Sequence, residues 1–591
     1  MQVAEKIAGL RNEMRAEGID ALIVANTDPH NNELVADRWR SREWLAHMKG
    51  SSGTVILTQD WCGLWADSRY YEAATEALAG SEIELVRMSD VGVLSIDGWL
   101  KSKMPDGAVI AFDGSVTDLQ QAKTWKESLE SAGYQLQTDF DLVERVWRDR
   151  PAAPKGEFFL VSEEFSGESI TSKIARAREE LAKLKVDAHL LGRTDESCWL
   201  LNFRGSDVVG NTTPYCYTLL TQNDIIFFVD EDKFPIGGKE IFTNAGVTVR
   251  PYEEVENALR ALPDSTRLLL VPRYTNFALA QAAAHCVQMN ERAILTDLKG
   301  VKNETEVAHL RNALIDDGAA MVKFYTWLYE SLRADKVVTE LSASRKLTEF
   351  RAEFPGFRQA SFESIMGYAA HGALNHYAVD EASDIPVKLE SIFLIDSGGN
   401  YEHGTTDTTR VIPMGEPTAV QKGDYSSVLR ALIELITLEF VEGATGAQLD
   451  GICRQALWKN GRNYKHGTGH GVGFGLEVHE GPQNISGSSV EKFVLGQITT
   501  IEPGCYRTGS HGIRIENMVH TVLSRETEFG RFFKFENLTF CPISVDLVDK
   551  SFLTAAQVDW LNAYNAETLD KLSPKLTEKE RAWLSHECRA I

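Results

Sequence analysis

Hydrophobic residues along the chain follow two alternating patterns, one helical and one strand-like. In the first 24 residues, MQVAEKIAGLRNEMRAEGIDALIV, charged residues interrupt apolar ones at helical spacing before an apolar run. This pattern predicts an amphipathic helix followed by a buried strand. The same order returns at 178–195, and apolar strand pairs around a Thr-Gln turn occur at 54–67 and 217–230. Because both sets come in the same order, we predict two related α/β domains.

Two further features divide the chain. The stretch RDRPAAPKGEF at 148–158 is rich in proline and charge, which is typical of a linker. From about residue 302 a long run carries apolar residues at helical spacing, and helical segments then alternate with glycine-punctuated β-rich segments. We therefore predict a mixed α/β (α+β) protein with domain I at 1–151, domain II at 152–301 and a third domain at 302–591 that ends in a helical tail.

Composition narrows the class of protein. The net charge of -24 over 591 residues argues against a nucleic-acid partner, which would require clustered lysine and arginine. No stretch approaches the roughly 20 apolar residues of a membrane span, and the first helix lacks the apolar core of a secretory signal. The eight cysteines are scattered without a CxxC pair, as in reduced intracellular proteins. We expect a cytoplasmic protein with no membrane partner.

Two similar hairpins in the third domain, at 392–412 and 498–522, each carry one acid on either side of a glycine-containing turn. The four acids are Asp396 and Asp407 in the first hairpin, and Glu502 and Glu516, the latter within the return strand, in the second. A buried acid is costly unless it is paired or bound to metal. Arg410 and Arg514 offer single salt bridges, but four converging carboxylates would repel one another unless cations held them.

The segment HGTGHGVGFGLEVHEGP at 466–482 lies between the hairpins and contributes His470. Four carboxylates and one imidazole form a mainly oxygen-donor set, which suits divalent manganese, iron or cobalt. Two such ions balance four negative charges, and a bridging hydroxide between them is then the expected nucleophile.

Other interpretations of this glycine-rich segment fail on spacing. A dinucleotide fingerprint needs a third glycine where the chain has Val472, Phe474 or Leu476, and no Walker pattern occurs. A zincin helix needs histidine at Gln483, and Pro482 would break that helix. We expect the glycines to let the backbone pass close to the metal cluster.

Taken together, LIDSGGNYEHGTTDTTR, HGTGHGVG, VHEGP, TIEPGCY and GIRIENMV resemble the metal-site motifs of the pita-bread metallopeptidases. The specific resemblance is to the long, three-domain cytosolic Xaa-Pro aminopeptidase (aminopeptidase P) family. TDPHNNELVADRWRSREWL, SSGTVILT, LLNFRGSDV, SFESIMGYAAHGALNHYA and FENLTFCPI extend it over nearly the whole chain. The resemblance implies two creatinase-like α/β domains followed by a pita-bread catalytic domain.

Carried over by motif, the resemblance assigns a role to each residue of the site. It implies five metal ligands: Asp396 on one ion, His470 and Glu502 on the other, and Asp407 and Glu516 bridging both. It implies that His376, His466 and His479 contact substrate or stabilise the intermediate, and that Glu502 is the general base. Arg514 becomes a partner of the carboxylates, and Arg69 helps to close the pocket for the substrate N-terminus.

The activity implied by the resemblance is removal of the N-terminal residue from peptides with proline in second position. It further implies a homodimer and two divalent ions, Mn²⁺ first, with Zn²⁺, Co²⁺ or Fe²⁺ as alternatives. One rival is a prolidase-like dipeptidase. The other, from a different class, is a non-catalytic pseudo-peptidase that binds or chaperones, which the intact set of five ligands opposes.

Overall fold

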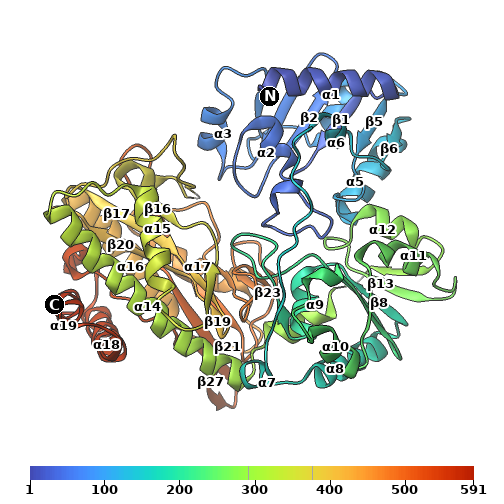
Figure 1. The fold of residues 1–591 in the computed structure, drawn as a ribbon. Coiled ribbons are helices and arrows are strands. Elements are labelled where there is room, and N and C mark those ends of the chain that lie inside the picture. The colour runs from blue at the N-terminus through green and yellow to red at the C-terminus, as the bar shows by residue number, and fades with distance from the viewer. Residues whose placement is uncertain (291, 376) are drawn as a thin grey trace. The chain divides into compact units, whose positions relative to one another are not determined.

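The computed structural model describes residues 1–290, 292–375 and 377–591 (Figure 1). The chain forms two compact units. Unit 1 comprises 1–160, 168–209 and 213–295, and unit 2 comprises 161–167, 210–212 and 296–591. Among the described residues, no helix is both long enough and apolar enough to cross a membrane.

Unit 1 contains two six-stranded sheets with equivalent strand orders, β4-β3-β2-β1-β5-β6 and β12-β11-β10-β8-β13-β14. The first sheet consists of β1 (Ala21–Val24), β2 (Thr54–Thr58), β3 (Cys62–Ala66), β4 (Glu84–Arg87), β5 (Val109–Phe112) and β6 (Gln135–Gln137). The second consists of β8 (Ala188–Leu191), β10 (Tyr217–Thr221), β11 (Ile225–Phe228), β12 (Thr248–Arg250), β13 (Arg267–Leu270) and β14 (Val287–Asn290). The first strand of each sheet pairs antiparallel with a hairpin and parallel with a later strand. The predicted duplication is confirmed.

Helices pack on these sheets with apolar faces, which form because apolar residues recur at the 3.6-residue helical spacing. In the first copy they are α1 (Val3–Glu17), α2 (Ser41–Ala46), α3 (Tyr71–Ala77), α4 (Ile96–Lys103), α5 (Leu119–Glu130) and α6 (Leu142–Val146). In the second copy they are α8 (Ile170–Leu184), α9 (Thr194–Leu200), α10 (Gly238–Asn244), α11 (Val255–Arg260) and α12 (Phe277–Ala282). Helix α1 buries Ile7, Leu10 and Met14, and α8 buries Ile174, Ala177 and Leu181 at the same spacing.

The two copies meet at equivalent helix starts. Asp118 caps α5 by accepting from the Gln121 amide, and Asn276 caps α12 by accepting from the Leu279 amide. These two caps form an antiparallel bridge with each other. The short strands β7 (Phe159–Leu160) and β9 (Phe203–Arg204) complete the unit.

Unit 2 is built from long helices and several small sheets. Its helices are α7 (Glu163–Ser166), α14 (Glu304–Arg333), α15 (Glu340–Arg351), α16 (Ala419–Ile436), α17 (Gly446–Trp458), α18 (Ala555–Leu572) and α19 (Glu578–Glu587), with α13 (Ile294–Gly300) at the unit boundary. Helices α18 and α19 form the predicted helical tail, and Trp560 stacks on Tyr564 within it.

The strands of unit 2 fall into four sheets, β15-β18-β19, β16-β17-β20, β21-β28-β27-β24-β22-β23 and the hairpin β25-β26. The first seven are β15 (Phe357–Ala360), β16 (Ile365–Tyr368), β17 (Ile392–Ser397), β18 (Gly399–Tyr401), β19 (Gly404–Thr405), β20 (Thr408–Pro413) and β21 (Glu439–Val441). The others are β22 (Gly469–Gly471), β23 (Glu480–Ile485), β24 (Ile498–Ile501), β25 (Gly504–Arg507), β26 (His511–Arg514), β27 (Asn517–Thr527) and β28 (Gly530–Asn537).

Strand β17 is buried on both faces, and its alternate side chains point into two different apolar clusters. Phe393 and Ile395 join the apolar cluster that includes residues of α14, whereas Ile392 and Leu394 join the cluster that includes residues of α16. Asp396 follows Leu394 by two residues, so it continues the face turned toward α16 and the second hairpin.

The second hairpin differs from the prediction at one point. Glu516 lies in a two-residue break between β26 and β27, whereas the sequence predicted it within a continuous return strand. Strand β26 pairs with β25, but β27 pairs with β24 and β28, so the chain must change sheets there. The freed Glu516 amide donates to the Thr409 carbonyl at 3.2 Å. The break therefore anchors the second hairpin to β20.

Candidate metal centre

The centre of the site is a cluster of three side chains. Asp407, His470 and Glu516 each offer a ligand atom, and these three atoms lie within 4.8 Å of one another. His470 Nε2 lies 3.4 Å from Asp407 Oδ2 and 3.8 Å from Glu502 Oε1. Oxygen and imidazole donors at such separations can share a single divalent ion.

The tautomer of His470 favours metal binding. Its Nδ1 lies 3.0 Å from the Gly471 carbonyl oxygen, which can only accept a hydrogen bond. The proton is therefore assigned to Nδ1, and the Nε2 lone pair faces Asp407 and Glu502. A histidine that binds a metal through one ring nitrogen usually donates a hydrogen bond from the other, as His470 does here.

Asp396 occupies the other side of the first hairpin. Its register partner across β17 and β20 is Thr409, and Asp407 lies two residues before Thr409, directly ahead of β20. Arg514 donates to Asp396 Oδ2, so the salt bridge considered from the sequence is present at this acid. Arg410 instead donates to backbone carbonyls, including that of Glu516 at 2.6 Å.

Thr409 joins the two hairpins. Its hydroxyl donates to Glu516 Oε2 at 2.7 Å and accepts from Arg514 Nε at 3.2 Å. Since Arg514 also reaches Asp396, these contacts connect one acid of each hairpin through a single threonine and a single arginine.

Two buried carboxylate oxygens test whether cations fit here. Among the described residues, no hydrogen-bond donor reaches Asp396 Oδ1 or Asp407 Oδ1, although both atoms are buried. Buried acceptors without donors are costly, and a bound cation would satisfy them. The donor set and the orphaned oxygens therefore fit divalent ions.

Electrostatics lead to the same conclusion. Burial, followed by the negative charges of Asp407, Asp396 and Glu502, raises the pKa of Glu516 well above its usual range. Burial raises the pKa of Glu502 to about 7, with Asp407 and Asp396 adding to the effect. His470 and Arg514 oppose the rise at Glu502 but do not cancel it, so these acids resist ionising together unless cations add positive charge.

His466 lies at the edge of the same cluster. Its Nδ1 lies 3.9 Å from Glu502 Oε2, and its Nε2 lies 2.8 Å from the Tyr506 hydroxyl. Arg514 donates to that hydroxyl at 2.6 Å. Tyr506 was not among the sequence predictions, although it follows Glu502 by four residues in the same motif. It connects His466 to the arginine that holds Asp396.

The loop that carries His466 is fixed by α17. Arg454 donates to the carbonyl oxygens of His466 and Tyr464, at 2.7 Å and 2.8 Å. The Thr468 hydroxyl donates to Asp450 Oδ1 at 2.5 Å, and Asp450 also pairs with Arg454. No local sequence signal marks this support, because the partners lie one turn apart on a helix that reads as ordinary.

Asp424, a buried acid outside the metal cluster, holds the hairpin that carries Tyr506 and Arg514. Asp424 on α16 accepts from Arg507 and from His511, whose Nε2 lies 3.0 Å away. Although burial raises it, hydrogen bonds from His511, Arg507 and Arg462 hold the pKa of Asp424 well below its usual range. The hairpin is thus anchored at its far end by a carboxylate that stays ionised.

His479 lies beside the metal-ligand candidate His470, with ring centroids 4.3 Å apart and the rings nearly perpendicular. The next residue, Glu480, is buried and pairs with Lys299 at 2.9 Å and with Lys302. This buried ion-pair group was not predicted from the sequence, and it fixes the backbone immediately after His479.

The glycines around His470 serve neighbouring strands. A Cβ on Gly469 would meet the Thr500 carbonyl oxygen at 1.9 Å, and one on Gly471 would meet the Glu480 carbonyl oxygen at 2.1 Å. These glycines let the backbone pass close to β23 and β24, and the predicted close approach to the metal cluster stays a prediction. The same strands exclude a zincin helix, as predicted.

Two residues of the predicted site are not placed with this cluster. His376 lies outside the described residues. Arg69 belongs to unit 1, where its Nε and Nη2 donate to Asp67 at 3.0 Å and 2.9 Å. Its role therefore stays a prediction.

The sequence matches family models along nearly its whole length. Residues 308–522 match metallopeptidase family M24, and 531–591 match the C-terminal region of that peptidase. Residues 6–146 and 149–306 each match a creatinase/prolidase N-terminal domain. The fold class predicted from the sequence is confirmed.

Full-length relatives refine this assignment. Aminopeptidase P2 of Arabidopsis thaliana is 33% identical over 631 residues, which cover 100% of this chain and 89% of the relative. A probable Xaa-Pro aminopeptidase P of Laccaria bicolor is 34% identical, and the match covers 100% of this chain and 94% of the relative. The chain therefore belongs to the aminopeptidase P family of M24 metallopeptidases.

Solved structures agree with this membership. The X-prolyl aminopeptidase of Caenorhabditis elegans, a cytosolic enzyme with a di-nuclear active site, superposes with a TM-score of 0.95 at 31% identity over 100% of both chains. The Xaa-Pro dipeptidase of Bacillus anthracis reaches a TM-score of 0.50 at 22% identity and covers 64% of this chain, so it shares the fold alone.

Proposed function

We propose that this protein is a two-metal aminopeptidase that removes the N-terminal residue from peptides with proline in second position. The observation that carries the proposal is the cluster of Asp407, His470 and Glu516, in which no donor from the described part of the chain reaches the buried Asp407 Oδ1. Membership of the aminopeptidase P family, and the di-nuclear site of the Caenorhabditis elegans relative, supply the reaction and the substrate class.

Five residues would hold the two divalent ions. We assign Asp396 to one ion, His470 and Glu502 to the other, and Asp407 and Glu516 to both. When bound, the ions would polarise the scissile carbonyl and lower the pKa of water enough for attack near neutral pH. We expect Mn²⁺, with Zn²⁺, Co²⁺ or Fe²⁺ as alternatives, because oxygen donors dominate the set.

The protein's own residues supply proton transfer and orientation. Glu502 accepts the proton of the attacking water and delivers it to the leaving proline nitrogen. His479, beside His470, donates to the oxygen that becomes negative in the transition state. His466, held by Tyr506 and Arg454, orients the substrate, and we assign His376 to the same task.

The proposal also covers the assembly, the location, the substrate and the domain organisation of the protein. We infer a homodimer, a cytoplasmic location and a peptide partner carrying an N-terminal Xaa-Pro sequence. We also infer three domains, at 1–151, 152–301 and 302–591, which the family matches at 6–146, 149–306 and 308–522 support. Arg69 is proposed to help close the pocket for the substrate N-terminus.

The test compares three peptides with metal-loaded protein. Ala-Pro-Ala should give alanine and Pro-Ala, Ala-Pro should be a poor substrate, and Ala-Ala-Ala should stay intact, as measured by mass spectrometry. Turnover of Ala-Pro alone would make the protein a prolidase-like dipeptidase. Binding of Ala-Pro-Ala without turnover, in protein that contains metal, would make it a pseudo-peptidase.

A further inference from the structure

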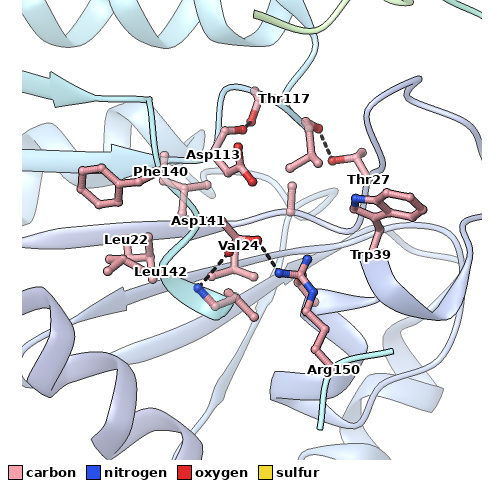
Figure 2. A pocket seen from close by; sticks show the side chains of 15 residues that line it. Leu22, Val24, Thr27, Trp39, Asp113, Thr117, Phe140, Asp141, Leu142 and Arg150 are labelled. Carbon is pink, nitrogen blue, oxygen red and sulfur yellow. Dashed lines mark hydrogen bonds and ion pairs between the residues drawn. The ribbon is translucent and has the colours of Figure 1, made fainter. Parts of the chain in front are cut away.

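A pocket in unit 1 lies at the carboxyl ends of the parallel strands β1 and β5 (Figure 2). The chain leaves β1 toward β2 on one side of the sheet and returns at β5 on the other side. Such a reversal opens a crevice at the strand ends, which is where α/β sheets usually bind ligands. The crevice is shallow and open to solvent, and its space of about 430 Å³ includes the solvent at its mouth.

The pocket is lined by apolar side chains on its walls and by three charged side chains. Figure 2 shows Leu22, Leu142 and Phe140 on one side of the pocket and Trp39 on the other. Asp113, Asp141 and Arg150 complete the lining with polar atoms. Apolar walls with a few placed polar groups are the usual composition of a small-molecule site.

Most polar atoms in the pocket already have partners. The hydroxyl of Thr27 donates to the Val116 carbonyl at 2.5 Å, and the hydroxyl of Thr117 donates to the Asp113 carbonyl at 2.7 Å. Asp141 caps the start of α6 through its Oδ1.

The remaining charges do not compensate Asp113. Arg150 Nη1 pairs with Asp141 and with Glu144 at 2.7 Å, so two carboxylates share its one positive charge. The Asp113 Oδ1 accepts from the amide and hydroxyl of Ser115, at 2.8 Å and 2.6 Å. Within the described residues, no hydrogen bond or ion pair reaches Asp113 Oδ2. Burial, and then the Asp141 carboxylate, raise the pKa of Asp113, although Ser115 and Arg150 oppose them.

The internal repeat shows that the fold does not need this acid. The equivalent position in the second copy, one residue after β13, is Val271. The turn is the same in both copies, because the Val116 amide donates to the Asp113 carbonyl and the Tyr274 amide donates to the Val271 carbonyl. Since valine suffices for the turn, the carboxylate of Asp113 is free to serve another purpose.

We infer that this pocket binds a small primary ammonium compound with a short apolar chain, whose charged group pairs with Asp113. A single free carboxylate oxygen is too few for Mg²⁺ or Ca²⁺, which take six or more oxygen ligands. An ammonium group needs only hydrogen-bond acceptors around it, and an alkyl chain suits the wall formed by Leu22, Phe140 and Trp39. The site is separate from the metal centre, which belongs to unit 2.

Methyl NMR on the full chain, labelled at leucine and valine methyl groups, tests the inference. Leu22, Val24, Val116 and Leu142 line the pocket and report on it directly. At pH 8, where the amine is protonated, n-butylammonium chloride should shift these four residues in a saturable way. Uncharged n-butanol, which has the same chain, should shift them with at least ~10-fold weaker affinity, because it lacks the charge-assisted hydrogen bond.

Two variants localise the effect. Asp113→Asn keeps the shape, and Asp113→Val copies the second repeat; each should weaken n-butylammonium binding at least ~10-fold while the methyl spectrum stays folded. Asp407→Ala alters the proposed metal centre and should leave the pocket shifts unchanged. Equal binding of butanol and butylammonium, or unchanged binding in both Asp113 variants, would overturn the inference. That result would leave the proposed peptidase activity intact.

Discussion

Thr409 donates a 2.7 Å hydrogen bond to Glu516 across 107 residues of sequence, and through it the two acidic hairpins share one support. Thr409→Val would remove this bond while keeping the side-chain shape, and would leave Glu516 free to rotate. We expect metal affinity to fall ~10- to 100-fold, as when an outer partner of a metal ligand is lost. Thr409→Ser keeps the hydroxyl and should retain affinity. Equal metal affinity in the valine and serine variants would contradict this role.

Gly467 and Gly469 give a matched pair for the packing around His470. Gly469→Ala places a methyl group 1.9 Å from the Thr500 carbonyl oxygen and should destabilise unit 2 by about 3 kcal/mol. Gly467→Ala meets nothing nearer than 3.5 Å and should be tolerated. Thermal unfolding of both variants checks this, and a Gly469→Ala protein as stable as the wild type would refute the packing argument.

Arg454 supports the His466 loop without belonging to the metal cluster. Arg454→Met removes the bonds to the His466 and Tyr464 carbonyls, so His466 should lose its fixed position. We expect kcat/KM on Ala-Pro-Ala to fall ~10- to 100-fold, since small misplacements near a reacting centre cost this much. Metal content should stay unchanged. Lys459→Met, at the exposed residue directly after the same helix, is the control and should match the wild type.

His189 on β8 predicts an acid sensitivity of unit 1. It is fully buried, and burial lowers its pKa from 6.5 to about 3. The unfolded chain therefore binds a proton below pH 6.5 that the folded chain refuses, so this histidine costs stability as pH falls. The cost should be about 1.4 kcal/mol per pH unit between roughly pH 6 and 3.

The variant His189→Leu isolates this effect. Urea titrations at several pH values give the free energy of unfolding of each protein. For His189→Leu this free energy should fall less steeply with falling pH than for the wild type, because the variant takes up one proton fewer on unfolding. His285→Gln, at an exposed position, is the control. Identical pH dependence in His189→Leu and wild type would show that His189 does not stay neutral in the fold.

Sequence periodicity predicted the two related α/β domains and the two hairpins that carry the acids, whereas the fold of the third domain came from motif resemblance. The repeated helix and strand patterns are local, and they predicted two related α/β domains because each element can be recognised from its own residues. Motif resemblance located Asp407, His470 and Glu516, which the structure brings within one cluster. The break at Glu516 was missed because a change of sheet depends on which strands pair, and apolar alternation continues through it.

Other features depend on partners far apart in sequence. Tyr506 is an unremarkable strand residue until His466 and Arg514 come to either side of it. Likewise Glu480 reads as a surface acid, and only the fold buries it against Lys299 and Lys302. Such contacts carry no periodic signal, so they could not be predicted from the chain alone.

The central claim is that five residues of unit 2 hold two divalent ions that the reaction needs. The most direct measurement is metal content per chain by mass spectrometry, taken together with Ala-Pro-Ala turnover, in wild type and Asp407→Ala. We predict two transition-metal ions per wild-type chain, and loss of bound metal together with loss of turnover in the variant. A wild-type protein that turns over Ala-Pro-Ala without stoichiometric metal, or an Asp407→Ala protein of unchanged activity, would contradict the account.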